Sequence, residues 1–225
     1  MGRGSPSNVA IVDFGLGNLF SVKQACQKTG IAAAVTSDPE EVATATAVIL
    51  PGVGAFGDAM QTLKMRSLDQ AVLEAHRLGK PIFGICLGMQ LLMSTSHEFG
   101  KHDGLGLIEG DVVPFQPGRE SSNGRLKVPH IGWEPICRPV EHTSSDTWAG
   151  GPLAGLRNGE YMYFVHSFYV KPSDVSVVTS ISSYGGTEFC SSLRKGRVVG
   201  FQFHPERSGP EGLRIYENLA RFISK

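Results

Sequence analysis

Apolar runs that alternate with helix-type patterns constrain the fold of this chain more than any other feature. The runs lie at Val9–Phe14, Ala47–Leu50 and Pro81–Ile85, and a glycine-containing turn follows each of them. After the turns, apolar residues recur at helical spacing, as Val22 and Cys26 do. Strands separated by helices form a largely parallel sheet with helices on both faces, and ligands bind at the carboxyl ends of its strands.

The second half of the chain, beyond residue 105, has a different pattern. Short β-type segments are separated there by turns that contain glycine and serine. These segments are Tyr161–Val170, Val175–Ile181, Glu188–Leu193 and Val198–Phe203. A final helix is predicted over Gly212–Ser224, where apolar residues form one stripe. We therefore expect a three-layer α/β/α fold, with a mostly parallel central sheet and an antiparallel β portion in the C-terminal half.

Length and charge limit the possible functions. The 225 residues, of which 41% are hydrophobic, suffice for the core of a single domain, expected over residues 8–225. Residues 1–7 are expected to be a disordered N-terminus or a cloning scar. With 21 basic and 21 acidic residues the net charge is zero, which disfavours nucleic acid as a partner. No apolar run suits a signal peptide or a membrane span, so we expect a soluble, cytoplasmic protein.

Three features that would indicate a bound metal or cofactor are incomplete. Gly15–Gly17 follows a strand as a dinucleotide-binding loop does, but Phe20 stands where the third glycine is needed. His97, Glu98 and His102 lack the spacing of a helical zinc site and are expected on the solvated surface. The four cysteines are too scattered for a disulfide framework or a zinc ribbon. The sequence therefore predicts no cofactor and no metal.

Cys86 is the strongest candidate for a nucleophile. It lies in the segment Gly84–Gly88, between a predicted strand and a predicted helix, which is the context of a nucleophile elbow with sulfur in place of oxygen. Glycines on both sides permit a tight turn, and the dipole at the helix N-terminus favours the thiolate. The N–H group of Leu87 would then face a developing oxyanion. A cysteine taken alone is more often a buried structural residue, but this context favours the nucleophile.

A base for this nucleophile is predicted in the segment Phe201–Glu206, at the end of an apolar strand. Residues two apart in an extended chain point to the same side, and the proline after His204 favours the extended conformation there. His204 and Glu206 can therefore approach each other, so that the carboxylate orients the imidazole. From these residues alone, a surface turn without a role fits equally well. The pairing with Cys86 favours a catalytic pair.

A second oxyanion donor is expected in the turn Pro51–Gly54, which ends a strand and should lie near Cys86 in a parallel sheet. The glycine-rich backbone at Val53 and Gly54 can present amides to a carbonyl oxygen. An ordinary glycine turn is the alternative, and for such a segment in isolation it is the more frequent interpretation.

Together the motifs GICLGMQ, PGVGAFG and FQFHPE resemble those of the class I (triad) glutamine amidotransferases, in the right order and over the chain from about Asn8 to its end. The resemblance implies the fold of that family and a thioester mechanism. Cys86 attacks the amide of glutamine, and His204, oriented by Glu206, gives a proton to the departing ammonia. Water then hydrolyses the thioester. The resemblance also implies that glutamine contacts Gly54, Gln90, Ser167 and Phe168.

Within this family the sequence is most similar to the glutaminase subunits of imidazole glycerol phosphate synthase, because it also contains VDFGLGN near its start and KVPHIGW at 127–133. The resemblance implies a heterodimer with a cyclase subunit. This partner is a (β/α)8 barrel that uses the ammonia to make imidazole glycerol phosphate and AICAR in histidine biosynthesis. Asn18, Trp133 and Tyr163 fall at positions expected near the subunit interface. Their alternatives are a helix-capping asparagine, a core tryptophan and a core tyrosine.

Two positions depart from the pattern of these subunits. Glu134 stands where an asparagine is expected and Arg207 where a lysine is more frequent, and both concern docking rather than the chemistry. Three other functions remain open: the glutaminase subunit of an anthranilate or aminodeoxychorismate synthase, a stand-alone cysteine hydrolase, and a non-catalytic module. The segment KVPHIGW disfavours the first, and the intact Cys86, His204 and Glu206 disfavour the last.

Overall fold

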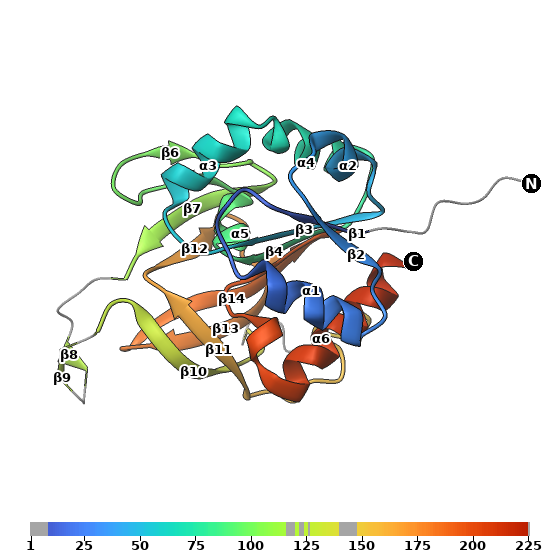
Figure 1. The fold of residues 1–225 in the computed structure, drawn as a ribbon. Helices are drawn as coiled ribbons and strands as arrows, with labels where there is room; N and C mark the ends of the chain where they lie inside the picture. The colour runs from blue at the N-terminus through green and yellow to red at the C-terminus, as the bar shows by residue number, and fades with distance from the viewer. Residues whose placement is uncertain (1–8, 116–119, 122–123, 126, 140–147, 225) are drawn as a thin grey trace, which may run out of the picture.

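A computed structural model describes residues 9–115, 120–121, 124–125, 127–139 and 148–224 (Figure 1). The expectation for residues 1–7 concerns residues outside this part. At the centre of the described chain lies a seven-stranded sheet in the order β13-β14-β15-β4-β3-β1-β2. Strands β15, β4, β3, β1 and β2 pair in parallel, and β13 and β14 extend the sheet by antiparallel pairing. The strands are β1 (Val9–Val12), β2 (Ala33–Thr36), β3 (Ala47–Gly52), β4 (Ile82–Cys86), β13 (Val178–Tyr184), β14 (Thr187–Lys195) and β15 (Val198–Phe201).

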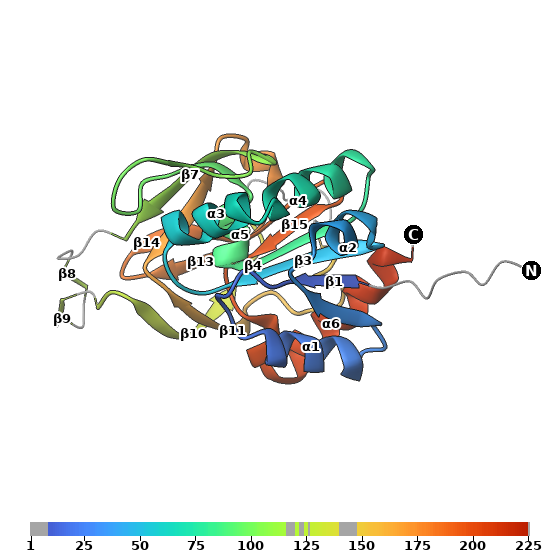
Figure 2. The same ribbon diagram turned by 45° about the horizontal axis from the view of Figure 1, so that its top comes forward.

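Helices cover both faces of this sheet, which confirms the predicted three-layer α/β/α arrangement (Figure 1, Figure 2). They are α1 (Leu19–Lys28), α2 (Pro39–Thr44), α3 (Phe56–Met65), α4 (Leu68–Arg77), α5 (Leu87–Leu91) and α6 (Gly209–Ile223). Helices α2 to α5 cover one face, and α1 and α6 cover the other. In β3, Val48 and Leu50 pack with the first group, whereas Ile49 packs with the second. Burial on both faces explains why the strands are continuous apolar runs.

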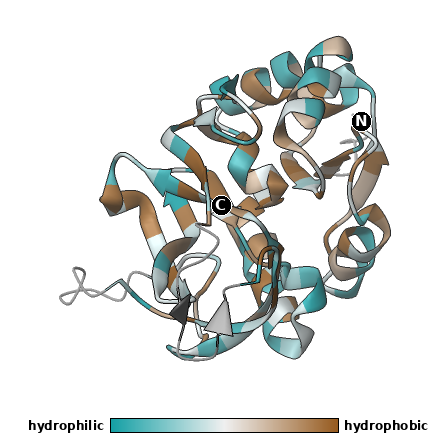
Figure 3. Ribbon diagram, turned by 90° about the vertical axis from the view of Figure 1, so that its left-hand side faces the viewer, coloured by the Kyte–Doolittle hydropathy of each residue, from teal (hydrophilic) through white to brown (hydrophobic). Residues whose placement is uncertain are grey.

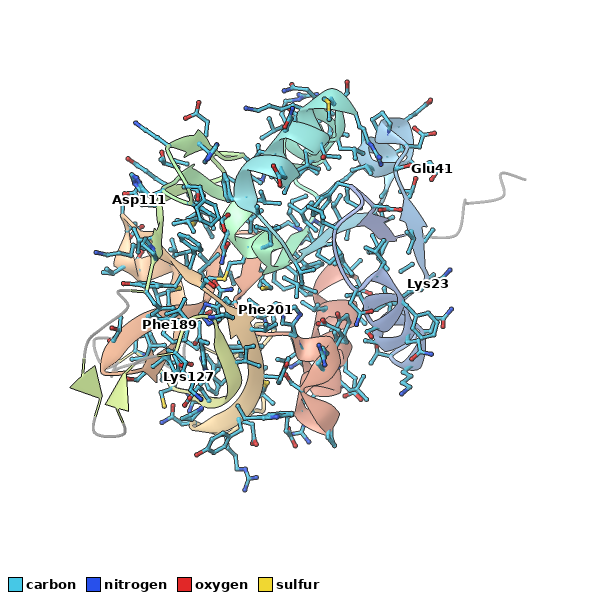
Figure 4. The ribbon with its side chains drawn as sticks, turned by 60° about the vertical axis from the view of Figure 1, so that its left-hand side comes forward. Lys23, Glu41, Asp111, Lys127, Phe189 and Phe201 are labelled. Carbon is cyan, nitrogen blue, oxygen red and sulfur yellow. The ribbon has the colours of Figure 1, made fainter. Side chains whose placement is uncertain are left out.

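Hydropathy follows these layers. Figure 3 shows apolar residues along the central strands, with hydrophilic residues concentrated on the outer surfaces of the helices. In Figure 4 the labelled Phe189 and Phe201 lie inside the molecule, whereas Lys23 and Glu41 lie at its margin. Each fully buried side chain of this size stabilises the fold by roughly 1.5–3 kcal/mol relative to an exposed one. The two cores on either side of the sheet therefore hold the layers together.

Local sequence signals set where two of the helices begin. Asp38 caps α2 by accepting a hydrogen bond from the N–H of Glu40 at 2.8 Å, and Pro39 occupies the first turn. An aspartate followed by proline is a typical start of a helix, and here it sets the first residue of α2. Asn18 caps α1 in the same way, with the N–H of Ser21 as donor at 3.2 Å.

Smaller sheets complete the fold. The first has the order β12-β7-β5-β6, and the pairs β10-β11 and β8-β9 are separate from it. The strands are β5 (Met93–Ser96), β6 (His102–Asp103), β7 (Ile108–Pro114), β8 (Glu120–Ser121), β9 (Gly124–Arg125), β10 (His130–Ile136), β11 (Glu160–His166) and β12 (Phe168–Pro172), with 3-10 turns η2 (Val175–Val177) and η3 (Pro205–Arg207). Among the helices of the described residues, none is long and apolar enough to cross a membrane.

Three boundaries in the C-terminal half differ from prediction. The segment Tyr161–Val170, predicted as one strand, is two strands that pair with β10 and β7, because the chain leaves the first sheet at Ser167. The next segment begins with the turn η2, so that β13 starts only at Val178. Strand β15 ends at Phe201, because the backbone bends immediately after it. Apolar content alone does not reveal such bends.

Candidate active site

Cys86 ends β4 and Leu87 begins α5, so the predicted turn between strand and helix is present. The backbone of Cys86 has φ 54° and ψ −110°, a strained conformation for a residue with a Cβ atom. A Cβ atom at Gly84 would lie 2.7 Å from the carbonyl of Gly88. One at Gly88 would lie 1.6 Å from the carbonyl oxygen of Leu50. The turn therefore requires glycine at both positions.

His204 and Glu206 follow β15, which pairs with β4 on the side away from β3. The backbone of His204 is extended, and its Nδ1 lies 2.8 Å from Oε1 of Glu206. Their side chains are only 6% and 1% exposed. The N–H of His204 donates to the carbonyl of Tyr163 at 2.9 Å, and the hydroxyl of Ser208 donates to the carbonyl of His204 at 2.7 Å. The backbone of His204 is thus fixed from both sides.

The charge of His204 depends on its neighbours. Burial lowers the pKa of His204, but the negative charges of a Cys86 thiolate and of Glu206 outweigh this and raise it to about 10. Within the described residues, Nε2 of His204 is buried and forms no hydrogen bond, while the thiol of Cys86 points to the carbonyl of Val165 at 3.6 Å. The negative charge of Cys86 is its largest effect on the pKa of His204. The pair can hold a proton on the imidazole and a negative charge on the sulfur.

A cavity of about 210 Å³ opens beside Cys86. All residues predicted for the oxyanion hole or for glutamine binding line it, namely Val53, Gly54, Leu87, Gln90, Ser167 and Phe168. Gly52, the last residue of β3, pairs with Cys86 at the end of β4. Parallel pairing therefore brings the turn after β3 next to the nucleophile, as the sequence predicted.

Gln90 connects the cavity with the nucleophile. Its Nε2 donates to the carbonyl of Phe168 at 3.0 Å and to Oε1 of Gln202 at 3.2 Å. Because both N–H groups are used in this way, Oε1 is the atom that Gln90 can offer to a bound ligand. Gln202 in turn donates from its Nε2 to the sulfur of Cys86 at 3.7 Å.

Two residues of the site escape the sequence patterns. Glu98, expected on the solvated surface, is only 9% exposed and lines the cavity, so that expectation is wrong. Its carboxylate accepts a hydrogen bond from the N–H of Phe56, and burial raises its pKa. No spacing signal connects the loop after β5 with the cavity. Gln202 precedes His204 by two residues, but the chain bends directly after Phe201, so this spacing does not by itself place its side chain beside the site.

Two buried histidines lie next to the cavity. Nδ1 of His166 lies 2.8 Å from the carbonyl of Phe168, and its Nε2 lies 3.2 Å from Nδ1 of His130. A carbonyl only accepts, so His166 carries its proton on Nδ1 and accepts at Nε2 from His130. Burial lowers the pKa of His166 to about 3 and that of His130 to about 4, so both are neutral at pH 7. Nε2 of His130 faces the carboxyl of Glu134 at 3.6 Å.

Residues 10–221 match the family described as Glutamine amidotransferase class-I. The chain is 42% identical to the imidazole glycerol phosphate synthase subunit HisH of Rhodopirellula baltica, over 94% of this chain and 96% of that protein. It is 44% identical to the HisH subunit of Syntrophotalea carbinolica, over 94% of this chain and 98% of that one. The chain belongs to the HisH family of class I glutamine amidotransferases. This membership confirms the predicted enzyme class and favours its imidazole glycerol phosphate synthase branch over the chorismate-type subunits.

Solved structures show the same fold. PurLQS from Thermotoga maritima superposes with a TM-score of 0.68 at 19% identity, over 96% of this chain and 98% of that chain. A crystal structure of a glutamine amidotransferase gives the same TM-score and identity, over 96% of this chain and 99% of that chain. At this identity the likeness concerns the fold alone, and it agrees with the predicted α/β class.

The residues predicted at the interface of a HisH-family subunit are accessible in the structure. Asn18 is exposed and also caps α1, so the capping alternative holds as well. Trp133 is 50% exposed, which excludes a core tryptophan. Its ring packs against that of half-buried Tyr163, with centroids 5.9 Å apart. The guanidinium of Arg207 lies 4.6 Å from the centre of the Tyr163 ring. Arg207, which stands where the family more often has a lysine, therefore contacts a residue of the predicted interface.

Proposed function

We propose that this HisH-family chain hydrolyses L-glutamine to glutamate and ammonia at Cys86 and passes the ammonia to a cyclase subunit. The partner is the (β/α)8 barrel of imidazole glycerol phosphate synthase, which makes imidazole glycerol phosphate and AICAR. One observation carries the proposal: Cys86 lies on the wall of a cavity beside the buried pair of His204 and Glu206. We place the reaction in the cytoplasm, where the four free cysteines stay reduced.

The cavity wall matches the polar groups of glutamine. The carboxylate of Glu98 is the anionic group on the wall and suits the α-ammonium of an amino acid. Oε1 of Gln90 accepts an N–H of the same ligand, because its own N–H groups are already bound. Gly54 and the segment Ser167–Phe168 complete the wall. This combination favours an amino acid whose side-chain amide reaches the sulfur.

The first half of the reaction forms a thioester. The thiolate of Cys86 attacks the amide carbon of glutamine, and the oxyanion that develops accepts hydrogen bonds from the N–H of Leu87 and from the turn Val53–Gly54. His204 gives the proton on Nε2 to the amide nitrogen. The C–N bond then breaks, ammonia leaves, and a γ-glutamyl thioester remains on Cys86.

The second half returns the enzyme to its starting state. Neutral His204 takes a proton from water, whose oxygen attacks the thioester carbonyl. The C–S bond breaks, glutamate leaves, and the thiolate of Cys86 faces a protonated His204 again. Glu206 holds Nδ1 of the imidazole throughout, so that Nε2 always carries out the proton transfer.

Glutamate release with and without the partner tests this proposal. The rate is measured for the chain alone and then for its complex with a cyclase subunit and the nucleotide ligand of that subunit. We expect strong stimulation in the complex. Cys86→Ala should reduce glutamine-dependent turnover by at least about a thousandfold, because the covalent step is lost.

Ammonia-dependent synthesis by the same complex is the control. Cys86→Ala should retain it, because this variant loses only the source of ammonia. Loss of both activities in a folded complex would contradict the role of Cys86. Full turnover without any partner would identify a stand-alone cysteine hydrolase, and a folded, docked wild type without turnover would point to a non-catalytic module.

A further inference from the structure

Gln202 is a fully buried polar residue that contacts the reacting sulfur. It is 0% exposed, its Nε2 donates to the sulfur of Cys86 at 3.7 Å, and its Oε1 accepts from Gln90 at 3.2 Å. A buried amide is destabilising unless both of its ends have partners. The sulfur is therefore one of the partners that this side chain requires.

A chain of contacts that begins on the backbone fixes the orientation of this amide. The carbonyl of Phe168 only accepts, so the atom of Gln90 that lies 3.0 Å from it is Nε2. The second N–H of Gln90 then needs an acceptor, and Oε1 of Gln202 is the atom that faces it. Nε2 of Gln202 is left to face Cys86. The donor points at the sulfur in the orientation that satisfies all of these groups.

The segment that follows β15 carries both Gln202 and the catalytic base. Residues 202, 204 and 206 alternate with the apolar residues Phe201 and Phe203, both of which are buried in the core beneath α1 and α6. Gln202 and His204 both act on Cys86, the first through a hydrogen bond and the second through its charge. Gln202 lies in the bend after β15 and Glu206 lies in the turn η3, and the folded segment brings the first to the sulfur of Cys86 and the second to His204.

We infer that Gln202 is a further catalytic residue, whose amide donates a hydrogen bond to the sulfur of Cys86 when the sulfur is negatively charged. The inference rests on the proposed glutaminase function. A thiolate accepts more strongly than a thiol or a thioester sulfur, so the bond is strongest before attack and when the thioester breaks. The carbonyl of Val165 has the opposite preference, because it accepts only from the thiol. Gln202 therefore favours the reactive form of Cys86.

Gln202→Met tests the inference in the complex with the cyclase subunit and its nucleotide ligand. Methionine fills a similar volume without a strong donor or acceptor. We expect kcat for glutamate release to fall on the order of tenfold to a hundredfold, while ammonia-dependent synthesis is unchanged. Alkylation of Cys86 by iodoacetamide at fixed pH, followed by mass spectrometry, should slow as well. Alkylation of Cys137, which is partly exposed, is the internal reference.

Two matched glutamine-to-methionine variants separate the sulfur contact from other effects. Gln90→Met removes a contact to the substrate and also the donor that orients the Gln202 amide, so we expect a higher KM together with a smaller slowing of Cys86 alkylation than in Gln202→Met. Gln70→Met changes an exposed residue of α4 and should leave turnover and alkylation as in wild type.

The outcomes distinguish the inference from the function on which it rests. Gln202→Met with wild-type turnover and alkylation would overturn the inference and leave the proposed function intact. A reduced kcat with unchanged alkylation of Cys86 would also overturn it, because the residue would then act through packing. A wild-type complex that releases no glutamate would instead overturn the proposed function.

Discussion

His166 joins Phe168, in the segment proposed to bind glutamine, to β10 through a fixed arrangement of protons. Each neutral imidazole carries one proton, so the series from the carbonyl of Phe168 through His166 to His130 ends in an unprotonated Nε2 that faces Glu134. Burial raises the pKa of Glu134, and only in its protonated form does this carboxyl offer a proton to that nitrogen. The asparagine expected at this position would donate at any pH. Because this chain has a glutamate there, the contact between residue 134 and His130 depends on the protonation of the Glu134 carboxyl.

The buried His166 predicts a loss of stability in acid. Its pKa is near 6.5 when unfolded and about 3 when folded, so its contribution is complete above pH 6.5 and is lost as the pH falls below it. Between these values only the unfolded chain binds the proton, which lowers the free energy of unfolding by about 1.4 kcal/mol per pH unit. Urea unfolding of wild type and His166→Phe between pH 7 and 4 measures the difference. We expect the difference in the free energy of unfolding between the two proteins to narrow by this slope as the pH falls. A difference that does not depend on pH would contradict a neutral His166.

At the scale of elements, the elbow between β4 and α5 depends on the close approach of β3. A Cβ atom at Gly88 would collide with the carbonyl oxygen of Leu50 at 1.6 Å, and neither backbone can move without disturbing the sheet. We expect Gly88→Ala to lower the free energy of unfolding by about 3 kcal/mol or more. Gly132→Ala in β10 is the matched control, because its Cβ atom would meet nothing within 4 Å. Denaturant titration of both variants checks the difference, and similar losses would refute the collision.

Elements with a strong local signal were predictable from sequence. The βα units of the first half, the elbow at Cys86 and the cap at Asp38 follow from apolar runs, glycines and capping residues that act over a few positions. The split at Ser167 and the burial of Glu98 were not predictable in this way. The split depends on which distant strands pair with the segment, and the burial of Glu98 depends on its contacts with α3 and the cavity wall. The catalytic and substrate-binding residues were named from motifs, whereas Gln202 becomes visible only through its contacts.

At the scale of the whole molecule, an apolar outer face lies on the pair β10-β11. Its members are exposed because they alternate along the strands with buried residues, and they are Ile131 at 61%, Trp133 at 50% and Tyr161 at 57% exposure. Large aromatic and aliphatic side chains that remain exposed together are typical of a protein interface. This face therefore suits the docking of the cyclase subunit.

Trp133→Ala should weaken that complex. Loss of a central aromatic contact costs about 2 kcal/mol or more, so we expect Kd to rise by at least about thirtyfold. Titration of a fluorescently labelled cyclase subunit measures it. Leu78→Ala is the control, because Leu78 is similarly exposed, at 52%. It precedes β4, at the other end of that strand from Cys86. This variant should leave Kd within about twofold of wild type. Equal effects of the two substitutions would refute docking on this face.

Strand β11 carries part of this outer face and also contacts both members of the proposed catalytic pair, Cys86 and His204. The carbonyl of Tyr163 accepts from the N–H of His204, and the carbonyl of Val165 accepts from the thiol of Cys86. A protein that binds this face and favours one position of β11 therefore also favours one state of Cys86, either with or without the hydrogen bond to Val165. Linkage makes this relation reciprocal, so glutamine changes the affinity of such a binder by the same factor. An engineered protein selected on this face only in the presence of glutamine would thus report amino-acid occupancy without touching the cavity.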